Sequence, residues 1–359
     1  MTIDRDAALT EAVRRAGWVS TVPSARARLR LAHRLEAWGA RLAFAIFGWF
    51  PLDWASAIGG ALGRAIGPRL DISKRARLNL VRVWPTLTDV EISRIIAGMW
   101  DNLGRVAAEY PHLREIRVFD RCGRVETHGL EHIDRAVAAG RRMIIFSAHI
   151  ANWEIAMVAA AQYGVSVAQI YRAANNPSVD RMITRFRGDG ELIPKGAVAA
   201  RRAIAVLRRG THLTMLADQK MNDGIPVPFF GRTAMTSSAL ASLALRFDCD
   251  VLPVRVERQG GARFRLTVFP RLPLPRSSDR LVCSFSAKTP DQSQSCYRLA
   301  RFWQCCYRGN VINVQRADDQ KRSNFRVSES VHGMRTRCGG PDDGLLNNRF
   351  KIGNFMPAK

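Results

Sequence analysis

A histidine and a glutamate five residues apart, His149 and Glu154, are well suited to acid–base chemistry. A histidine held by a carboxylate serves as a general base near neutral pH, because the carboxylate fixes the tautomer and stabilises the imidazolium as it forms. On one regular helix, residues five apart point about 140° away from each other. The two side chains can therefore meet only if His149 lies in a turn before the helix that carries Glu154.

The residues around the pair predict such a turn. Residues 143–146 are apolar or β-forming, small residues follow, and Asn152 can cap a helix that begins at Trp153. This order places His149 at the carboxyl end of a strand, where α/β sheets present active groups. The spacing alone is also compatible with an unrelated loop histidine and an acidic residue favoured by the helix dipole.

Other predicted strands also end in charged or amide side chains. The strands cover residues 165–172, 191–194 and 212–217, and the side chains at their ends are Arg172, Lys195, Asp218 and Gln219. Several such ends in one chain indicate a single convergent site. Arg172 can hold a phosphate with two hydrogen bonds or stabilise an oxyanion. Asn175 lies in a turn beyond Arg172, and Phe230 offers apolar surface to an acyl chain.

The alternation of predicted helices and strands indicates an α/β fold, with a mixed central sheet flanked by helices. The last two strands, residues 251–258 and 263–269, flank a hairpin signal at residues 259–262. Residues 117–127 are predicted as another strand. A helix is predicted at residues 89–109, capped by Thr86 or Thr88.

The sequence from His149 to Glu154 resembles the H-x4-D/E signature of glycerolipid-type acyltransferases, and in particular the lauroyl/myristoyl (late) acyltransferases of lipid A biosynthesis. The order and spacing of the matching motifs cover about residues 40–275. The further motifs that carry the resemblance are Met99–Gly104, Glu109–His112, Tyr171–Arg172, Asn175–Pro177, Pro194–Gly196, Asp218–Gly224 and Pro228–Gly231.

The resemblance implies a glycerolipid-acyltransferase-like fold and transfer of an acyl chain from acyl-acyl carrier protein to a hydroxyl of a Kdo-bearing lipid A precursor. It implies His149 and Glu154 as the catalytic residues. The sequence has no serine in a G-x-S-x-G elbow and no cysteine beside His149. We therefore expect direct attack by the acceptor hydroxyl, without a covalent intermediate. We expect no cofactor. We also expect no metal, because His149, Glu154 and Asp218 are not joined by a second histidine at metal-ligand spacing.

The chain carries 55 Lys and Arg residues against 31 Asp and Glu, a net charge of +24. Such a charge implies an anionic partner. Nucleic acid is not expected, because zinc-finger spacing, a P-loop and RNA-binding aromatic signatures are missing from the sequence. An acidic carrier protein, a phosphorylated lipid acceptor and the anionic surface of the inner membrane, on its cytoplasmic face, fit the charge. The few cysteines before residue 281 suit a reducing compartment.

Three segments are predicted. Residues 1–66 are predicted to form a basic lead-in followed by a helical membrane-associating segment, because they contain two apolar runs, at residues 42–50 and 54–62. Pro51 and Asp53 separate the two runs and argue against one continuous membrane span. A membrane span, an interfacial helix and a buried helix all remain open for this segment. Residues 67–280 form the catalytic domain. Residues 281–359 lose the alanine-rich, periodic character of the rest, so we expect a divergent tail, frameshifted or disordered.

Two alternatives remain. A glycerophospholipid acyltransferase acting on 1-acylglycerol-3-phosphate usually carries H-x4-D, whereas this chain has Glu154. A protein of another class, a catalytically impaired enzyme fold that binds membranes or nucleic acid through its basic surface, would show salt-dependent binding without acyl transfer.

Overall fold

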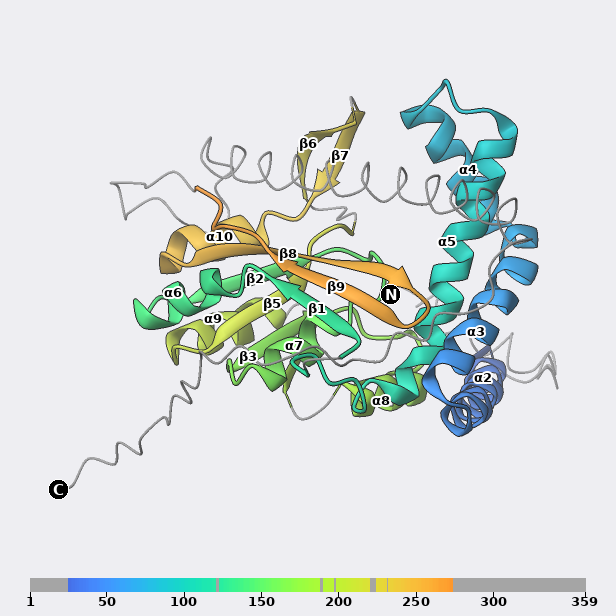
Figure 1. The fold of residues 1–359 in the computed structure, drawn as a ribbon, viewed down its shortest axis with the longest axis horizontal. Coiled ribbons are helices and arrows are strands. Elements are labelled where there is room, and N and C mark those ends of the chain that lie inside the picture. The colour runs from blue at the N-terminus through green and yellow to red at the C-terminus, as the bar shows by residue number, and fades with distance from the viewer. Residues whose placement is uncertain are drawn as a thin grey trace, which may run out of the picture. The chain divides into compact units, whose positions relative to one another are not determined.

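The central element of the fold is a sheet that carries predicted site residues at one edge. The computed structural model describes residues 25–120, 123–187, 190–196, 198–219, 224–230 and 232–273. Within them, seven strands form one sheet in the order β1-β9-β8-β2-β5-β3-β4 (Figure 1). The strands are β1 (Val125–His128), β2 (Met143–Ser147), β3 (Val167–Tyr171), β4 (Glu191–Pro194), β5 (His212–Leu216), β8 (Asp250–Gly260) and β9 (Arg263–Val268).

The middle of the sheet is parallel. Strand β2 pairs in parallel with β5 and β8, and β3 pairs in parallel with β5 and β4. Only the β8–β9 hairpin introduces an antiparallel pair among the described strands of this sheet. The carboxyl ends of β2, β3, β4 and β5 therefore share one edge, which confirms the predicted mixed α/β architecture.

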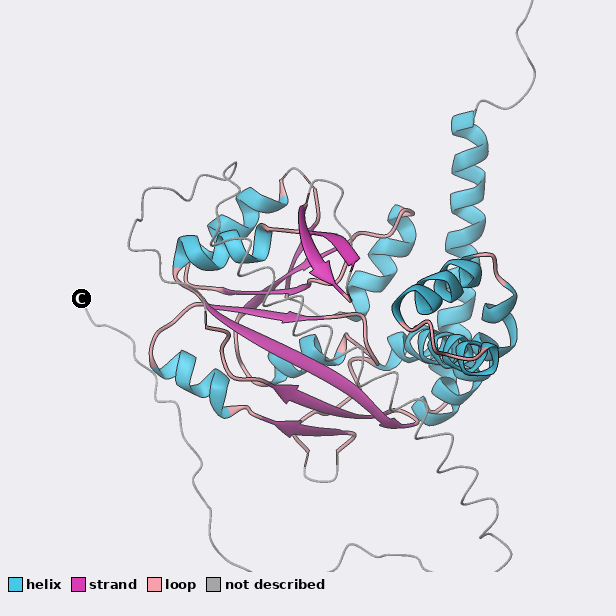
Figure 2. Cartoon of the chain, turned by 90° about the horizontal axis from the view of Figure 1, so that it is seen from above, coloured by secondary structure: helices cyan, strands magenta, loops and turns pink. Residues whose placement is uncertain are grey.

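Helices cover both faces of the sheet, so alternate residues of each strand enter different cores (Figure 2). Met143 and Ile145 point into the core that contains α6 (Glu131–Ala138) and α7 (Ile155–Gln162). Ile144 and Phe146 point into the opposite core, built with α9 (Ala199–Arg208) and α10 (Ala239–Phe247). Strand β2 is buried on both sides, which explains its continuous apolar sequence.

The N-terminal helices lie beside the sheet (Figure 1). They are α2 (Ala25–Trp49), α3 (Leu52–Ile66), α4 (Ile72–Val83) and α5 (Asp89–Glu109). Helix α5 begins with a capping box in which Thr88 and Glu91 bond each other's backbone N–H groups. Helices α3 and α5 cross closely because glycines meet there: a Cβ atom on Gly59 would lie 2.5 Å from the carbonyl oxygen of Gly104.

Several sequence predictions need correction. The strand predicted at residues 117–127 is reduced to β1, and the helix predicted from Trp153 begins at Ile155. Helix α8 (Pro177–Phe186) and the hairpin formed by strands β6 (Ile225–Phe229) and β7 (Arg232–Thr236) were not predicted. The predicted helix at residues 89–109 is confirmed, with Thr88 as its cap.

The three predicted segments of the chain are tested by the structure to different extents. Across the described residues, none of the helices combines the length and the apolar character needed to cross a membrane. Helix α3 packs along α5. The boundary predicted between residues 66 and 67 stays a prediction, and the tail predicted at 281–359 lies outside the described residues.

Candidate active site

The turn after β2 presents His149 at the carboxyl edge of the sheet. Strand β2 ends at Ser147, and α7 begins at Ile155. Between them Ala151 adopts a left-handed conformation with φ of 47°, which reverses the chain. The side-chain oxygen of Asn152 accepts a hydrogen bond from the backbone N–H of Glu154 at 3.1 Å. This bond closes a turn before the helix; the N-cap of α7 is Glu154, so the predicted capping role of Asn152 is wrong.

Asp218, not Glu154, is the carboxylate that binds His149. The Nδ1 atom of His149 lies 2.8 Å from Oδ1 of Asp218, and the backbone N–H of His149 donates to Oδ2 at 2.9 Å. The strand register explains the pairing, because Ser147 of β2 lies opposite Leu216 of β5 and each chain continues for two residues. The predicted contact between His149 and Glu154 is therefore wrong.

Glu154 is buried and engaged elsewhere. Its carboxylate accepts hydrogen bonds from Nε and a terminal nitrogen of Arg187 at 2.9 and 2.7 Å, from the Tyr110 hydroxyl at 2.7 Å and from Trp153 Nε1 at 3.0 Å. Only 1% of its side chain is exposed, against 33% for His149. Glu154 thus supports the floor of the site, while His149 reaches its open side.

The partners of Glu154 keep their protons. Burial, and then the negative charge of Glu154, raise the pKa of the Tyr110 hydroxyl well above its usual range, so Tyr110 remains a donor. Burial alone would lower the pKa of Arg187, but the hydrogen bonds and charge of Glu154 outweigh it and raise that pKa. Arg187 also lies over the Tyr171 ring, with 5.1 Å between its Cζ atom and the ring centroid.

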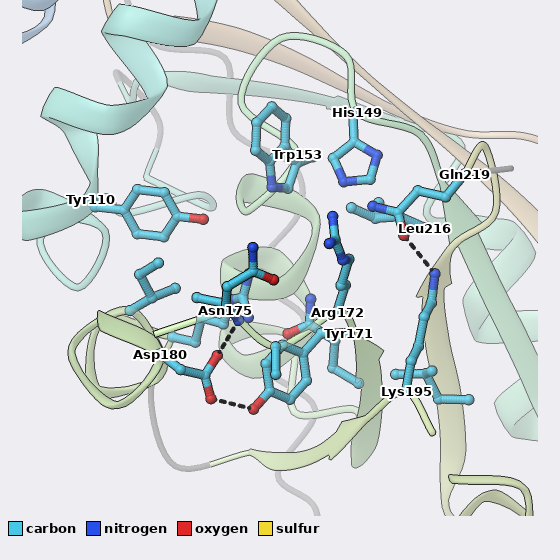
Figure 3. Close-up of a pocket in the computed structure, with 16 residues that line it drawn as sticks. Tyr110, His149, Trp153, Tyr171, Arg172, Asn175, Asp180, Lys195, Leu216 and Gln219 are labelled. Carbon is cyan, nitrogen blue, oxygen red and sulfur yellow. Dashed lines mark hydrogen bonds between the residues drawn. The ribbon is translucent and has the colours of Figure 1, made fainter. Parts of the chain in front are cut away.

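A cavity of about 310 Å³ opens beside His149 (Figure 3). Its wall brings together most of the residues predicted for the site, namely His149, Arg172, Asn175, Lys195 and Gln219. Arg172 extends toward His149, and Lys195 donates a hydrogen bond to Oε1 of Gln219 at 2.9 Å (Figure 3). The predicted convergence of strand ends is seen in this part of the chain.

Two cations stand side by side in the cavity because of the sheet register. Tyr171 of β3 lies opposite Pro194 of β4, so the next residues, Arg172 and Lys195, are neighbours. Burial lowers the pKa of the Lys195 ammonium; the charge of Asp218 opposes this shift and that of Arg172 adds to it. The pair gives the cavity a positive wall suited to an anionic group.

Phe230 lies away from this cavity wall. It sits at the tip of the β6–β7 hairpin, where its ring centroid is 5.3 Å from that of Trp84 and 4.8 Å from that of Phe229. Its role toward an acyl chain stays a prediction. No cluster of three or more His, Cys, Asp or Glu side chains with metal-binding geometry occurs among the described residues.

Sequence reasoning missed several residues of the site. Arg187 follows the unpredicted helix α8, so nothing in the sequence pointed to it as the partner of Glu154. Asp180, on the same helix, accepts hydrogen bonds from the Tyr171 hydroxyl at 3.0 Å and the Ala174 N–H at 2.9 Å, and so shapes the loop after β3 (Figure 3). The general rule that a buried glutamate needs a cationic partner indicates that such a residue exists, but it does not single out Arg187.

Comparisons with known proteins agree with the resemblance seen in the sequence. The profile of the family described as bacterial lipid A biosynthesis acyltransferase matches residues 24–295, more than half of the chain. The chain is 25% identical over 271 residues to a lipid A biosynthesis acyltransferase of Haemophilus influenzae, covering 69% of this chain and 81% of that protein.

Among solved structures, the chain is similar to the 1-acyl-sn-glycerophosphate acyltransferase PlsC of Thermotoga maritima. That similarity has 14% identity and a TM-score of 0.31, and covers 72% of this chain and 96% of the other. The match to the family profile, which spans the whole described site, decides the assignment. The chain belongs to the bacterial lipid A biosynthesis acyltransferase family and is an acyltransferase.

Proposed function

We propose that this protein transfers a fatty acyl chain from acyl-acyl carrier protein to a hydroxyl of a phosphorylated, Kdo-bearing lipid A precursor. The observation that carries the proposal is the His149–Asp218 pair at the mouth of a cavity with a cationic wall. Family membership supplies the acyl transfer and the lipid A context.

His149 acts as the general base. Asp218 occupies Nδ1 and so leaves the lone pair on Nε2 available to the acceptor hydroxyl. Nε2 takes the hydroxyl proton as the oxygen attacks the thioester carbonyl carbon. The carbon–sulfur bond then breaks, and the imidazolium returns its proton to the departing thiolate. Every atom is accounted for without a covalent acyl-enzyme.

Arg172 stabilises the negative charge that develops on the carbonyl oxygen or holds an acceptor phosphate. Its side chain extends toward His149, so it lies near the reacting atoms (Figure 3). Lys195, Gln219 and Asn175 provide further donors along the same wall. The phosphate and sugar oxygens of a phosphorylated sugar lipid can accept hydrogen bonds from these donors, whereas an apolar acyl chain cannot.

The protein works at the cytoplasmic face of the inner membrane, attached through α2. One face of this helix exposes an apolar stripe of large side chains, and both acidic carrier protein and anionic lipid complement the net charge of +24. The stripe consists of Leu31, Leu35, Trp38, Leu42, Ile46 and Trp49. Their spacing of three or four residues keeps them on one side of the helix.

The test is an acyl-transfer assay with the full chain in detergent or in membranes. The purified protein is incubated with the lipid A precursor and with acyl-acyl carrier proteins that carry acyl chains of several lengths. The products are identified by mass spectrometry. An equal amount of 1-acylglycerol-3-phosphate competes in the same reaction. We expect the lipid A precursor to gain one acyl chain. Acylation of the glycerophosphate alone would replace this function with phospholipid synthesis, and salt-sensitive lipid binding without product would remove the enzymatic role.

A further inference from the structure

The turn that carries His149 is strained. Ala151, two residues after the base, adopts the left-handed conformation although it carries a Cβ atom. Such a conformation persists only when surrounding contacts hold it. Since a small rotation of this turn would move Nδ1 of His149 away from Asp218, the contacts that hold Ala151 bear directly on the base.

Two asparagine side chains that are not part of the cavity wall hold the turn. Asn102 of α5 donates from Nδ2 to the carbonyl oxygen of Ala151 at 2.9 Å. Asn152 donates from Nδ2 to Oε2 of Glu109 at 2.8 Å, while its Oδ1 accepts from the Glu154 N–H at 3.1 Å. The two contacts fix the residues on either side of the peptide bond after Ala151.

A buried ion pair holds the two asparagines. The carboxylate of Glu109 is fully buried and accepts from both terminal nitrogens of Arg258, at 2.6 and 3.1 Å, and from the Ser56 hydroxyl at 2.7 Å. Nε of Arg258 donates to Oδ1 of Asn102 at 3.1 Å. Arg258 comes from the β8–β9 hairpin, which reaches α5 (Figure 1).

These contacts connect four residues that lie outside the wall of the cavity. The residues Asn102, Glu109, Asn152 and Arg258, here called the turn-holding cluster, touch one another and the turn, but none of them lines the cavity. The Glu109–Arg258 ion pair alone would be enough to hold α5 against the β8–β9 hairpin. The additional hydrogen bonds to Ala151 and Asn152 connect the ion pair to the turn residues next to His149 and restrict their movement.

We propose that the turn-holding cluster positions His149 for acyl transfer, by fixing the strained turn in the geometry that sets the imidazole against Asp218. This inference rests on the proposed function of His149 as the base. The members of the cluster act through the turn and touch neither substrate nor reacting atoms. A change confined to the Ala151 bond therefore affects the rate constant of the bound complex and leaves substrate affinity unchanged.

Asn102→Asp tests the proposal in the full chain. A carboxylate at this position keeps an acceptor for Nε of Arg258, but it loses the donor to Ala151 and opposes that carbonyl oxygen. We expect kcat to fall at least tenfold while the KM for each substrate stays within twofold. Hydrogen exchange followed by mass spectrometry should show faster exchange in residues 147–154. Asn102→Ser, which is too short to reach Ala151, should act in the same direction if the aspartate folds poorly.

Ile92→Val is the matched control, because Ile92 is a buried residue of the same helix and lies ten residues, or about 15 Å along the helix axis, from Asn102. It should lower thermal stability without altering kcat or exchange at residues 147–154. Unchanged exchange or unchanged kcat in both Asn102 variants would overturn the positioning role, as would equal effects from Ile92→Val. Exchange needs no substrate, so a wild-type protein without acyl transfer would refute the proposed function separately, leaving the exchange result to report on the turn itself.

Discussion

His149 and Asp218 are joined by two hydrogen bonds, one through the imidazole Nδ1 at 2.8 Å and one through the backbone N–H of His149 at 2.9 Å. The second bond ties the carboxylate to the main chain of the residue that it orients. Asp218 is therefore fixed relative to His149 even when the imidazole changes its charge. Its side chain is only 7% exposed, so water competes little for the carboxylate.

We expect Asp218→Asn to lower kcat by about 10² to 10⁴, because an amide can stabilise the wrong tautomer and carries no charge. His149→Ala should lower kcat by about 10² or more. The double variant should lose little beyond the larger single loss, since the two residues act as one unit. Steady-state kinetics with both substrates measures this.

The control for these variants is Glu191→Gln, which removes a carboxylate that pairs with Arg202 and Arg209 at the start of β4. Its kinetics should match the wild type. Near-normal turnover by folded Asp218→Asn protein would remove the carboxylate from the mechanism, and losses that multiply in the double variant would show that the two residues act independently.

Glu154 and His149 should differ in their effect on stability. Glu154→Ala leaves the buried guanidinium of Arg187 without its carboxylate, so we expect the free energy of unfolding to fall by about 3–5 kcal/mol. His149→Ala should change it by about 1 kcal/mol or less, as for other partly exposed substitutions. Urea denaturation measures both.

A second variant isolates the ion pair. Glu154→Gln combined with Arg187→Met removes both charges, and we expect it to be more stable than either single variant. If Glu154→Ala unfolds with the wild-type free energy, the pair with Arg187 contributes nothing to the fold, and a direct role for Glu154 toward substrate would regain support.

The sequence located the strand ends that carry the site residues, but it did not identify which side chains bind each other. Apolar runs followed by polar residues located the ends of β2, β3, β4 and β5. The partner of His149 depends on strand order, and β2 neighbours β5 although β3 and β4 intervene in the chain. Single-sequence patterns contain no information on that order.

The missed helix shows a second limit. The Asn175-Asn176-Pro177 run favours a turn, but only Asn175 and Asn176 form a bend; Pro177 begins α8, and Asn176 caps that helix by accepting from the Ser178 N–H. Proline at the first helical position suits a helix start as well as a turn. Because α8 was not predicted, Arg187 at its end could not be matched to Glu154.

We expect acceptor binding to depend on pH through Lys195. Burial lowers its pKa, so the ammonium loses its charge at a lower pH than an ordinary lysine, whose pKa is about 10.4. The cation is present below its pKa and lost as pH rises, so we expect the KM of a phosphorylated acceptor to increase at a pH below that at which an ordinary lysine, with a pKa of about 10.4, would lose its charge. Lys195→Arg stays charged at that pH and should flatten that increase. Parallel KM profiles for the two proteins would show that Lys195 does not contact the acceptor.

Arg172→Lys separates two roles for the arginine. The variant keeps the charge but loses the planar fork that bonds a phosphate or an oxyanion through two donors. We expect acyl transfer to fall substantially while stability stays within about 1 kcal/mol, because Arg172 is exposed. A higher acceptor KM at constant kcat would assign Arg172 to acceptor binding, and an equal fall in kcat and kcat/KM to the transition state. Unchanged kinetics would exclude both.

The apolar stripe on α2 should determine membrane attachment. Trp38, Leu42 and Trp49 are 65%, 46% and 88% exposed, so replacing all three by serine removes apolar surface that makes little contact within the protein. Burial of such side chains contributes roughly 1.5–3 kcal/mol each when complete, so the triple variant should bind membranes at least tenfold more weakly. Substitution in place keeps α3 packed on α5, which deletion of residues 1–66 would not.

Partition between membrane pellet and supernatant is measured after a high-salt wash, which weakens attachment through the basic surface. Val137→Ser and Val198→Ser, at exposed positions on α6 and just before α9, serve as controls and should leave partition unchanged. If the triple variant stays with the membrane as firmly as the wild type, α2 is not the attachment site. If it leaves the membrane but keeps its acyl-transfer rate on detergent-dispersed acceptor, attachment and catalysis reside in separate parts of the chain, because the stripe lies on α2 and His149 on the sheet edge.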